Sequence, residues 1–275
     1  MQIRKKVFLC SIVFLAFISC EDVIEVTTPD VATRLVLDAV IRVAEENSVT
    51  NVTVYATETS NFFESSLPAE LTEIKIINTS TGVALALSET EMGSGIYSRP
   101  ISTTFLTQSN MQLRVVYNNE IYTASANYTA TLPINSIEQG SESLFADDQT
   151  EVIVSFNDDP GTDNFYVFDF SFGNFLVTED EFYQGQEFDF SYFYDNELVV
   201  GETTSISILG ASQDFYRYMD RIIQLSTSDT GPFSTPVGTV RGNIINETTP
   251  NTPNFALGYF AICQTYSETI TITEN

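Results

Sequence analysis

The chain has 275 residues and no histidine, and this absence excludes several kinds of chemistry. Ser-His-Asp and Cys-His catalysis both need an imidazole that acts as a base. Catalytic zinc sites are nearly always built with histidine, and haem and copper sites lose a usual ligand. Acyl-transfer and redox enzymes are therefore poor interpretations of this sequence, and we expect no cofactor.

Positively charged residues are also scarce. The chain has 11 lysines and arginines against 37 aspartates and glutamates, a formal net charge of −26 at pH 7. Three of the eleven are Arg4, Lys5 and Lys6, so eight remain for the rest of the chain. Nucleic-acid binding needs a basic surface that displaces counterions from phosphates, so we expect no nucleic-acid partner. So few positive residues also argue against a basic cleft for acidic substrates.

Cysteine is the third scarce residue, with three copies at Cys10, Cys20 and Cys263. The first two lie in the N-terminal 20 residues. We expect Cys10 to be removed with a signal peptide and Cys20 to be lipidated, for the reasons given below. Cys263 is then alone, so no disulfide can form within the chain. Because it follows the apolar, strand-like run of residues 259–262, we expect a buried and unreactive thiol.

The N-terminal 20 residues have the layout of a bacterial lipoprotein signal. A cationic start is followed by an apolar run from Val7 to Ile18, a small residue at Ser19, and then Cys20. The run is shorter than the roughly 20 residues that a membrane-spanning helix needs, which favours cleavage. We therefore expect residues 1–19 to be a signal peptide, and Cys20 to carry the acyl chains that anchor the protein to a membrane.

The remainder of the chain is predicted to be all-β. After a polar tether over residues 20–33, short runs of β-branched and aromatic residues recur with turn residues between them, as in β-sandwiches. The first seven runs fit an immunoglobulin-like sandwich at 34–131. Pro133 marks a boundary, and a second, larger sandwich is predicted at 135–275. The predicted strands are 35–41, 52–56, 73–78, 83–87, 95–97, 113–117, 120–124, 152–156, 165–172, 188–193, 204–209, 255–262 and 268–272.

One segment has helical periodicity instead. Phe215, Tyr218, Met219 and Ile222 follow one another at spacings i, i+3, i+4 and i+7, and Ser212 can cap the first turn. This pattern predicts one substantial helix near 213–226, laid over one face or end of the second sheet.

Aromatic residues crowd between Phe165 and Tyr194. If 165–172 is one strand, its alternation places four aromatic side chains on one side, in the core. Over 179–194 the aromatics are interspersed with acids, which predicts that several reach a surface that binds a ligand or partner. The core residues would be Tyr166, Phe168, Phe170 and Phe172, and the surface candidates are Phe182, Tyr183, Phe188, Tyr192 and Tyr194.

Two kinds of carboxylate chemistry are conceivable. Asp158, Asp159 and Asp163 supply oxygen ligands of the kind that Ca²⁺ prefers, although Asp and Gly also form turns unaided. Pairs of acids could serve glycoside hydrolysis, but 37 acids form many pairs by chance. The simpler interpretation of both is a turn and a solvated surface, with no metal bound.

Several short motifs carry a resemblance to a known family. The chain is similar to the Bacteroidetes-type lipoproteins grouped as domain of unknown function family 4249, from about residue 20 to the end. The shared motifs are Cys20-Glu21-Asp22, Arg34-Leu35-Val36-Leu37-Asp38-Ala39-Val40-Ile41, Asp159-Pro160-Gly161 before Asn164-Phe165-Tyr166, Pro232-Phe233-Ser234-Thr235-Pro236-Val237, Gly242-Asn243-Ile244 and Leu257-Gly258-Tyr259-Phe260.

The resemblance implies an outer-membrane lipoprotein, often encoded beside a TonB-dependent receptor. It brings no catalytic residues, and Glu21 and Asp22 would form the signal for export to the cell surface. We therefore expect a non-enzymatic binding or accessory protein that associates with a TonB-dependent transporter. The alternatives are a surface polysaccharide hydrolase with paired carboxylates and a structural or adhesive surface protein.

Overall fold

A computed structural model describes residues 33–60, 65–144, 149–195, 198–227, 239–250 and 254–274. The predictions for the signal peptide, for Cys20, Glu21 and Asp22, and for the tether lie outside the described residues. Within them the chain is all-β with one substantial helix, which confirms the predicted fold class. Contacts between Cα atoms group Thr33–Asn275 into one compact unit.

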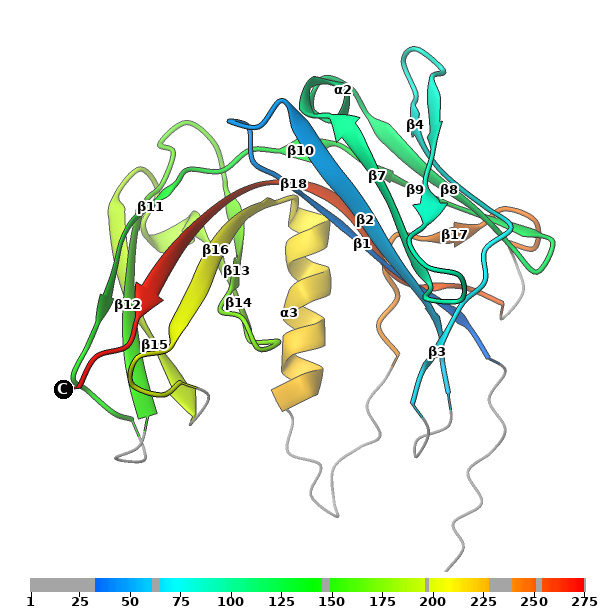
Figure 1. Cartoon of the computed structure of the whole chain (residues 1–275). Helices are drawn as coiled ribbons and strands as arrows, with labels where there is room; N and C mark the ends of the chain where they lie inside the picture. Colours follow the sequence, from blue (N-terminus) through cyan, green and yellow to red (C-terminus); the bar gives the residue numbers. More distant parts are fainter. Residues whose placement is uncertain are drawn as a thin grey trace, which may run out of the picture. The chain divides into compact units, whose positions relative to one another are not determined.

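The largest sheet has ten strands, and we call it the long sheet (Figure 1). Its main path runs in the order β14-β13-β16-β18-β1-β2-β7-β6, with β10 beside β18 and β3 beside β2. These strands are β1 (Leu35–Val43), β2 (Val49–Glu58), β3 (Leu67–Pro68), β6 (Ser88–Glu89), β7 (Ile96–Ser102), β10 (Tyr128–Thr129), β13 (Phe165–Asp169), β14 (Phe175–Glu179), β16 (Thr203–Ala211) and β18 (Leu257–Thr271).

The last strand, β18, lies in the middle of the long sheet and joins its two halves. Its residues 257–264 pair in parallel with β1, and its residues 265–271 pair antiparallel with β16. The prediction of two separate strands at 255–262 and 268–272 is therefore wrong. The residues between those two runs keep their ladder partners, and no glycine or proline interrupts them.

Two smaller sheets pack on the long sheet to form sandwiches. One has five strands in the order β17-β9-β8-β4-β5, and the other has three in the order β11-β12-β15. Their strands are β4 (Glu73–Asn78), β5 (Ala84–Ala86), β8 (Met111–Tyr117), β9 (Glu120–Ala126), β11 (Ile134–Gln139), β12 (Gln149–Asn157), β15 (Glu187–Asp195) and β17 (Ile245–Asn246). Two short helical turns, α2 (Thr103–Thr107) and η1 (Asp180–Phe182), lie in the connections.

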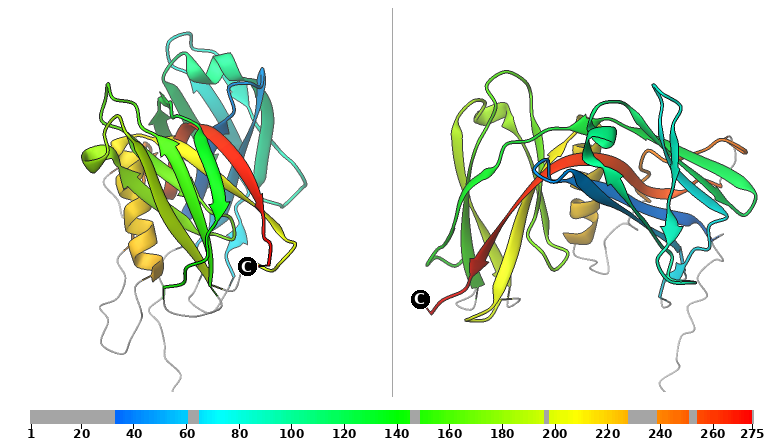
Figure 2. Two further views of the ribbon diagram at one scale, coloured as in Figure 1. Left: turned by 90° about the vertical axis from the view of Figure 1, so that its left-hand side faces the viewer. Right: turned by 45° about the horizontal axis from the view of Figure 1, so that its top comes forward.

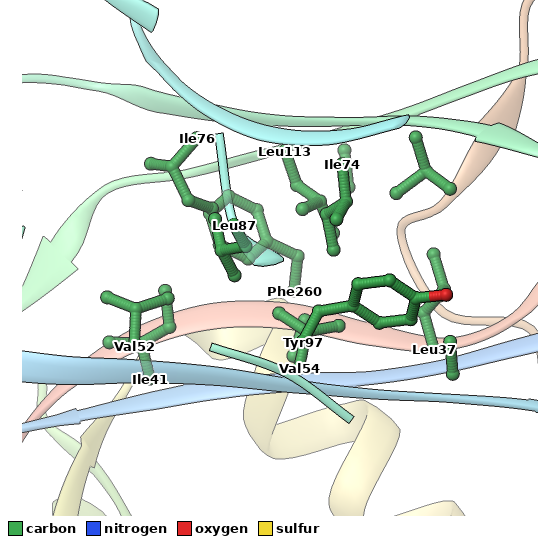
Figure 3. Packing of buried hydrophobic residues seen from close by; sticks show 14 of the residues in the cluster. Leu37, Ile41, Val52, Val54, Ile74, Ile76, Leu87, Tyr97, Leu113 and Phe260 are labelled. Carbon is green, nitrogen blue, oxygen red and sulfur yellow. The ribbon is translucent and has the colours of Figure 1, made fainter. Parts of the chain in front are cut away.

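The first sandwich encloses an aliphatic core, which we call the N-terminal core (Figure 3). Alternate residues of β1 are buried from Leu35 to Val43, as expected for a strand with one face on a core. Leu37 and Ile41 of β1 meet Ile74 and Ile76 of β4 there, together with Phe260 of β18.

The second sandwich encloses an aromatic core, which we call the C-terminal core. Phe156 of β12 makes edge-on contacts with the rings of Tyr166 and Phe168 at 5.2 and 5.3 Å. Phe170 stacks on Tyr192 of β15 at 3.9 Å. Such pairs add about 0.5–1.5 kcal/mol each beyond the area that they bury, so this core gains specificity from ring geometry.

Phe172 departs from the predicted strand. β13 ends at Asp169, and Ser171 and Phe172 have positive φ values of 63° and 53° in a tight turn closed by the Phe170 N–H and the Asn174 carbonyl. Tyr166, Phe168 and Phe170 lie in the C-terminal core as predicted, whereas Phe172 is exposed. The prediction for Phe172 is wrong because the turn breaks the alternation.

The division into two domains stays a prediction. The N-terminal core takes its residues up to Ala126 and the C-terminal core begins at Ile134, on either side of the predicted boundary. However, Phe260 and Ile262 of β18 belong to the first core, and Ile272 just beyond β18 belongs to the second. One strand thus serves both halves of the compact unit.

The helix α3 (Gln213–Thr227) covers the other face of the long sheet, as Figures 1 and 2 show. Its first turn is capped by Ser212, whose Oγ accepts a hydrogen bond from the Phe215 N–H at 3.3 Å. Phe215 packs on Tyr259 and Ala261 of β18, whereas their neighbour Phe260 points into the N-terminal core. The predicted helix and its cap are confirmed.

Gly258 allows β18 to lie close against β1, and its replacement tests this contact. Gly258 has φ +94°, and a Cβ there would lie 1.9 Å from the Leu37 carbonyl oxygen. We expect Gly258→Ala to lower the free energy of unfolding in urea by about 3 kcal/mol or more. Gly173 also has positive φ, +81°, but has open space around it, so Gly173→Ala should cost only about 1–2 kcal/mol. Equal losses in both variants would contradict the close approach.

Candidate functional site

The predicted aromatic surface is mostly a core in the structure. Tyr183 and Tyr194 are buried, and Phe188 and Tyr192 are partly buried against the C-terminal core. The Tyr194 hydroxyl donates to the Phe170 carbonyl at 2.8 Å, which satisfies it in the interior. Phe182 alone among the five predicted residues has a fully open side chain, with 87% of its surface exposed.

The reason lies in β15, where the aromatic residues and the polar residues alternate. Phe188, Phe190, Tyr192 and Tyr194 point toward the core, while the residues between them are mostly exposed. The alternation is visible in the sequence and indicates a half-buried strand. The mixture of acids and aromatics therefore marks the two faces of one strand at 187–195, and the prediction of an aromatic binding surface there is wrong for Phe188, Tyr192 and Tyr194.

The predicted calcium ligands are occupied by the protein itself. Asp158 is buried, and its two carboxylate oxygens accept hydrogen bonds from the Tyr166 hydroxyl and from the Gly185 N–H. Asp159 accepts from the Gly161 N–H at 3.1 Å. Asp163 only approaches Gln184, at 3.5 Å. No group of three acids, cysteines or histidines that could hold a metal ion occurs among the described residues. Asp159 thus stabilises a turn, and Asp158 links the end of β12 to Tyr166 and Gly185.

Three arginines gather beside α3 in a cavity of about 320 Å³, which we call the arginine pocket. Arg217 and Arg221 are one helical turn apart on α3, so they project on the same side. Arg241 comes from the segment that precedes Gly242. The remaining wall of the pocket consists of Asp214, Tyr218, Gly242, Asn243 and Tyr259.

Arg241 is fixed in place by its neighbours. The Asn243 side chain binds the β18 backbone twice, donating to the Phe260 carbonyl at 2.8 Å and accepting from the Phe260 N–H at 2.9 Å. Gly242 lies so close to β18 that a Cβ would be 1.7 Å from the Gly258 carbonyl oxygen. The guanidinium of Arg241 sits 3.5 Å above the ring of Phe255, a favourable cation–π geometry.

The arginine pocket corrects the expectation that so acidic a chain has no basic cleft. The ion pairs between described residues involve Arg42, Lys75 and Arg114. Arg217 and Arg221 have no acidic partner within the described ranges, although both are exposed on a strongly acidic chain. Sequence reasoning missed this cluster, although the i, i+4 spacing of the two arginines on a predicted helix was a usable signal.

A second cavity, of about 260 Å³, adjoins the arginine pocket, and we call it the apolar groove. It runs between α3 and the long sheet, and Tyr218 and Tyr259 line both spaces. Burial raises the pKa of the Tyr218 phenol to about 12, and the nearby Asp38 and Tyr259 add to the rise, so this hydroxyl stays neutral at physiological pH. The apolar part of the lining is Val36, Leu37, Val40, Val167, Phe175, Leu209, Phe215, Met219 and Ile222.

A third cavity, of about 250 Å³, also has Asn243 and Tyr259 in its lining and is more polar than the apolar groove. It also reaches Asp214 on α3, and Asn110 and Asn127 from the first sandwich. Asn110 and Asn127 bind each other at 3.0 Å. The three cavities thus surround Tyr259, the β18 residue on which α3 packs.

The described residues form an all-β protein with one substantial helix and an arginine-lined cavity. The comparison with known families points to the same family as the motifs in the sequence. Residues 21–269 match the family described as Domain of unknown function (DUF4249), and the chain belongs to that family. No curated protein matches the chain. Among the described residues, no helix is both long enough and apolar enough to cross a membrane.

Cys263 lies on β18 beneath α3, and the predicted burial of its thiol is confirmed. Its side chain is 1% exposed, and burial raises the pKa of the thiol from 9.0 to about 12. A neutral buried thiol is a poor nucleophile, so the site has no activated cysteine.

This pKa shift predicts a pH dependence of stability. The contribution of the neutral Cys263 thiol to the free energy of unfolding is fully present below pH 9. It is lost as the pH rises from 9 to 12, because only the thiol of the unfolded chain ionises in that range. Between pH 8 and pH 10 the thiol should lower the free energy of unfolding by about 1.4 kcal/mol. Tyrosine ionisation affects the parent chain and the variant alike. The free energy of unfolding of Cys263→Ala should therefore fall by that much less than that of the parent chain over the same interval. Identical losses in urea unfolding would contradict the burial of the thiol.

Proposed function

We propose that this chain is a lipid-anchored outer-membrane protein of the cell surface that binds a ligand or partner and assists a TonB-dependent transporter without catalysing a reaction. The observation that carries the binding role is the pair of adjoining cavities beside α3, one lined by three arginines and one by apolar side chains. Concave sites with apolar walls and a few convergent polar groups are typical of ligand binding.

The location is supported by the N-terminal sequence and by the family. The cationic start, the apolar run and Cys20 form a lipoprotein signal, and Glu21 and Asp22 follow it as the family's surface-export pattern would have them. The acidic chain would be repelled by anionic lipid head groups, so the acyl chains would supply the attachment. Association with a TonB-dependent barrel rests on the family resemblance, which is an associational argument.

The polysaccharide hydrolase is less well supported. Glycoside hydrolysis needs two carboxyl groups about 5 Å or about 6.5–9.5 Å apart, facing a cavity. Four cavities lined by described residues have at most one carboxylate each in their linings. The buried acids Glu151, Asp158 and Asp180 each accept hydrogen bonds from protein donors, which gives them a structural role. No observation specifically favours an adhesin.

Lipidation and export can be tested by substitution near the cleavage site. We expect Cys20→Ser to abolish incorporation of labelled palmitate and to release the protein from the membrane fraction, because no other anchor is predicted. Glu21→Ala with Asp22→Ala should keep the label but lose accessibility to protease added to intact cells. A lipidated double variant that is as accessible as the parent chain would contradict the export role of the two acids.

The transporter association can be tested by isolating the tagged lipoprotein from its own membranes in a gentle detergent. We expect a TonB-dependent barrel in stoichiometric amount by mass spectrometry. Phe182→Ser should reduce the recovered barrel at least about fivefold if this exposed ring is an interface anchor.

The matched control is Phe172→Ser. Phe172 is also an exposed aromatic residue, but it lies at the opposite end of the β13–β14 hairpin from Phe182. A clean monomer from the parent chain would contradict the accessory role. Equal losses in both variants would show that Phe182 is not a specific contact.

A further inference from the structure

We infer that the arginine pocket and the apolar groove form one binding site for an amphipathic organic anion. The anionic group lies on Arg217, Arg221 and Arg241, and the apolar portion of the ligand lies between α3 and the long sheet. This inference rests on the proposed binding function and names the chemical class of the ligand.

The first argument is the unusual position of the positive charge. On a chain with a net charge of −26, most arginines could find an acidic partner, yet Arg217 and Arg221 have none among the residues that the structure describes. Two like charges at i, i+4 on a helix repel each other by a few tenths of a kcal/mol. A bound anion removes that cost and uses guanidinium donors that suit carboxylates, sulfates and phosphates.

The second argument is that the two spaces adjoin. Tyr218 and Tyr259 form part of both linings and pack on each other with ring centroids 4.8 Å apart, so a ligand that occupies both spaces lies over this pair of rings. Taken together, the two cavities of about 260 and 320 Å³ fall within the size range of small-molecule sites, roughly 300–1,000 Å³. A small inorganic anion would leave the groove unfilled, and a neutral lipid would leave the arginines without a partner.

The acids near the site define its charge. Asp214 lines the arginine pocket, and Asp38 lines the groove, where Arg42 forms an ion pair with Asp169 at 2.5 Å. The arginine pocket therefore holds three positive groups against one negative group. An anion is favoured at that end and not in the groove, which fixes the direction in which the ligand lies.

The test is calorimetric titration of decanoate into the chain that begins at residue 21, which has no acyl chains to compete with the probe. It contains the whole compact unit Thr33–Asn275. We expect one molecule of decanoate to bind per chain below its micelle-forming concentration. Acetate, which has only the anionic group, and decanol, which has only the tail, should each bind at least about tenfold more weakly.

Variants separate the two halves of the site. Arg217→Gln with Arg221→Gln should weaken decanoate binding at least about tenfold, whereas Arg99→Gln, which changes an exposed arginine bound to the Ala86 carbonyl, should leave it unchanged. Ile222→Gln in the groove should weaken binding, and Val199→Gln on an exposed surface should not.

Three results would overturn the inference: no binding to the parent chain, decanoate binding that the arginine variants leave intact, or acetate binding as tightly as decanoate. Thermal unfolding of every variant shows whether a loss reflects misfolding. Recovery of the transporter from membranes is measured separately, so the inference about the ligand can fail while the proposed accessory function stands.

Discussion

The structure depends on the pairing of β18 with two strands from opposite halves of the chain. Residues 257–264 lie parallel to β1 and residues 265–271 lie antiparallel to β16, so a single strand closes both sandwiches. The pairing with β1 joins segments more than 200 residues apart, which has a cost in loop entropy.

β18 is also the strand that connects the core to the site. From Gly258 to Thr265 it is buried on both faces, since the five-stranded sheet covers one side and α3 covers the other. Phe260 enters the N-terminal core, while Tyr259 faces α3 and lines the arginine pocket and the apolar groove. Successive residues of one strand thus belong to the core and to the walls of the site.

Much of the fold could be predicted from local patterns, and the exceptions have physical causes. The strands at β1 and β4 show clear alternation, and the helix shows its cap and its apolar stripe, so both followed from sequence. The continuity of β18 depends on partners far away in the chain, which no local pattern contains. The β15 segment, predicted as a strand at 188–193, alternates aromatic and polar residues with a period of two, but the acids within it indicated rings on a binding surface instead of in a core. The arginine pocket depends on Arg241 meeting α3, a tertiary contact without a sequence signal.

The distribution of positive charge gives the strongest indication of what the site is for. Within the described part of the chain, Arg42, Lys75 and Arg114 are used in ion pairs, and Arg99 binds a backbone carbonyl. Arg34 and Arg241 both lie over the ring of Phe255. Arg217 and Arg221 are the exception, since no acid among the described residues pairs with them. Their guanidinium donors are therefore unused by the acids of the described residues, which is the observation on which the inferred anion site rests.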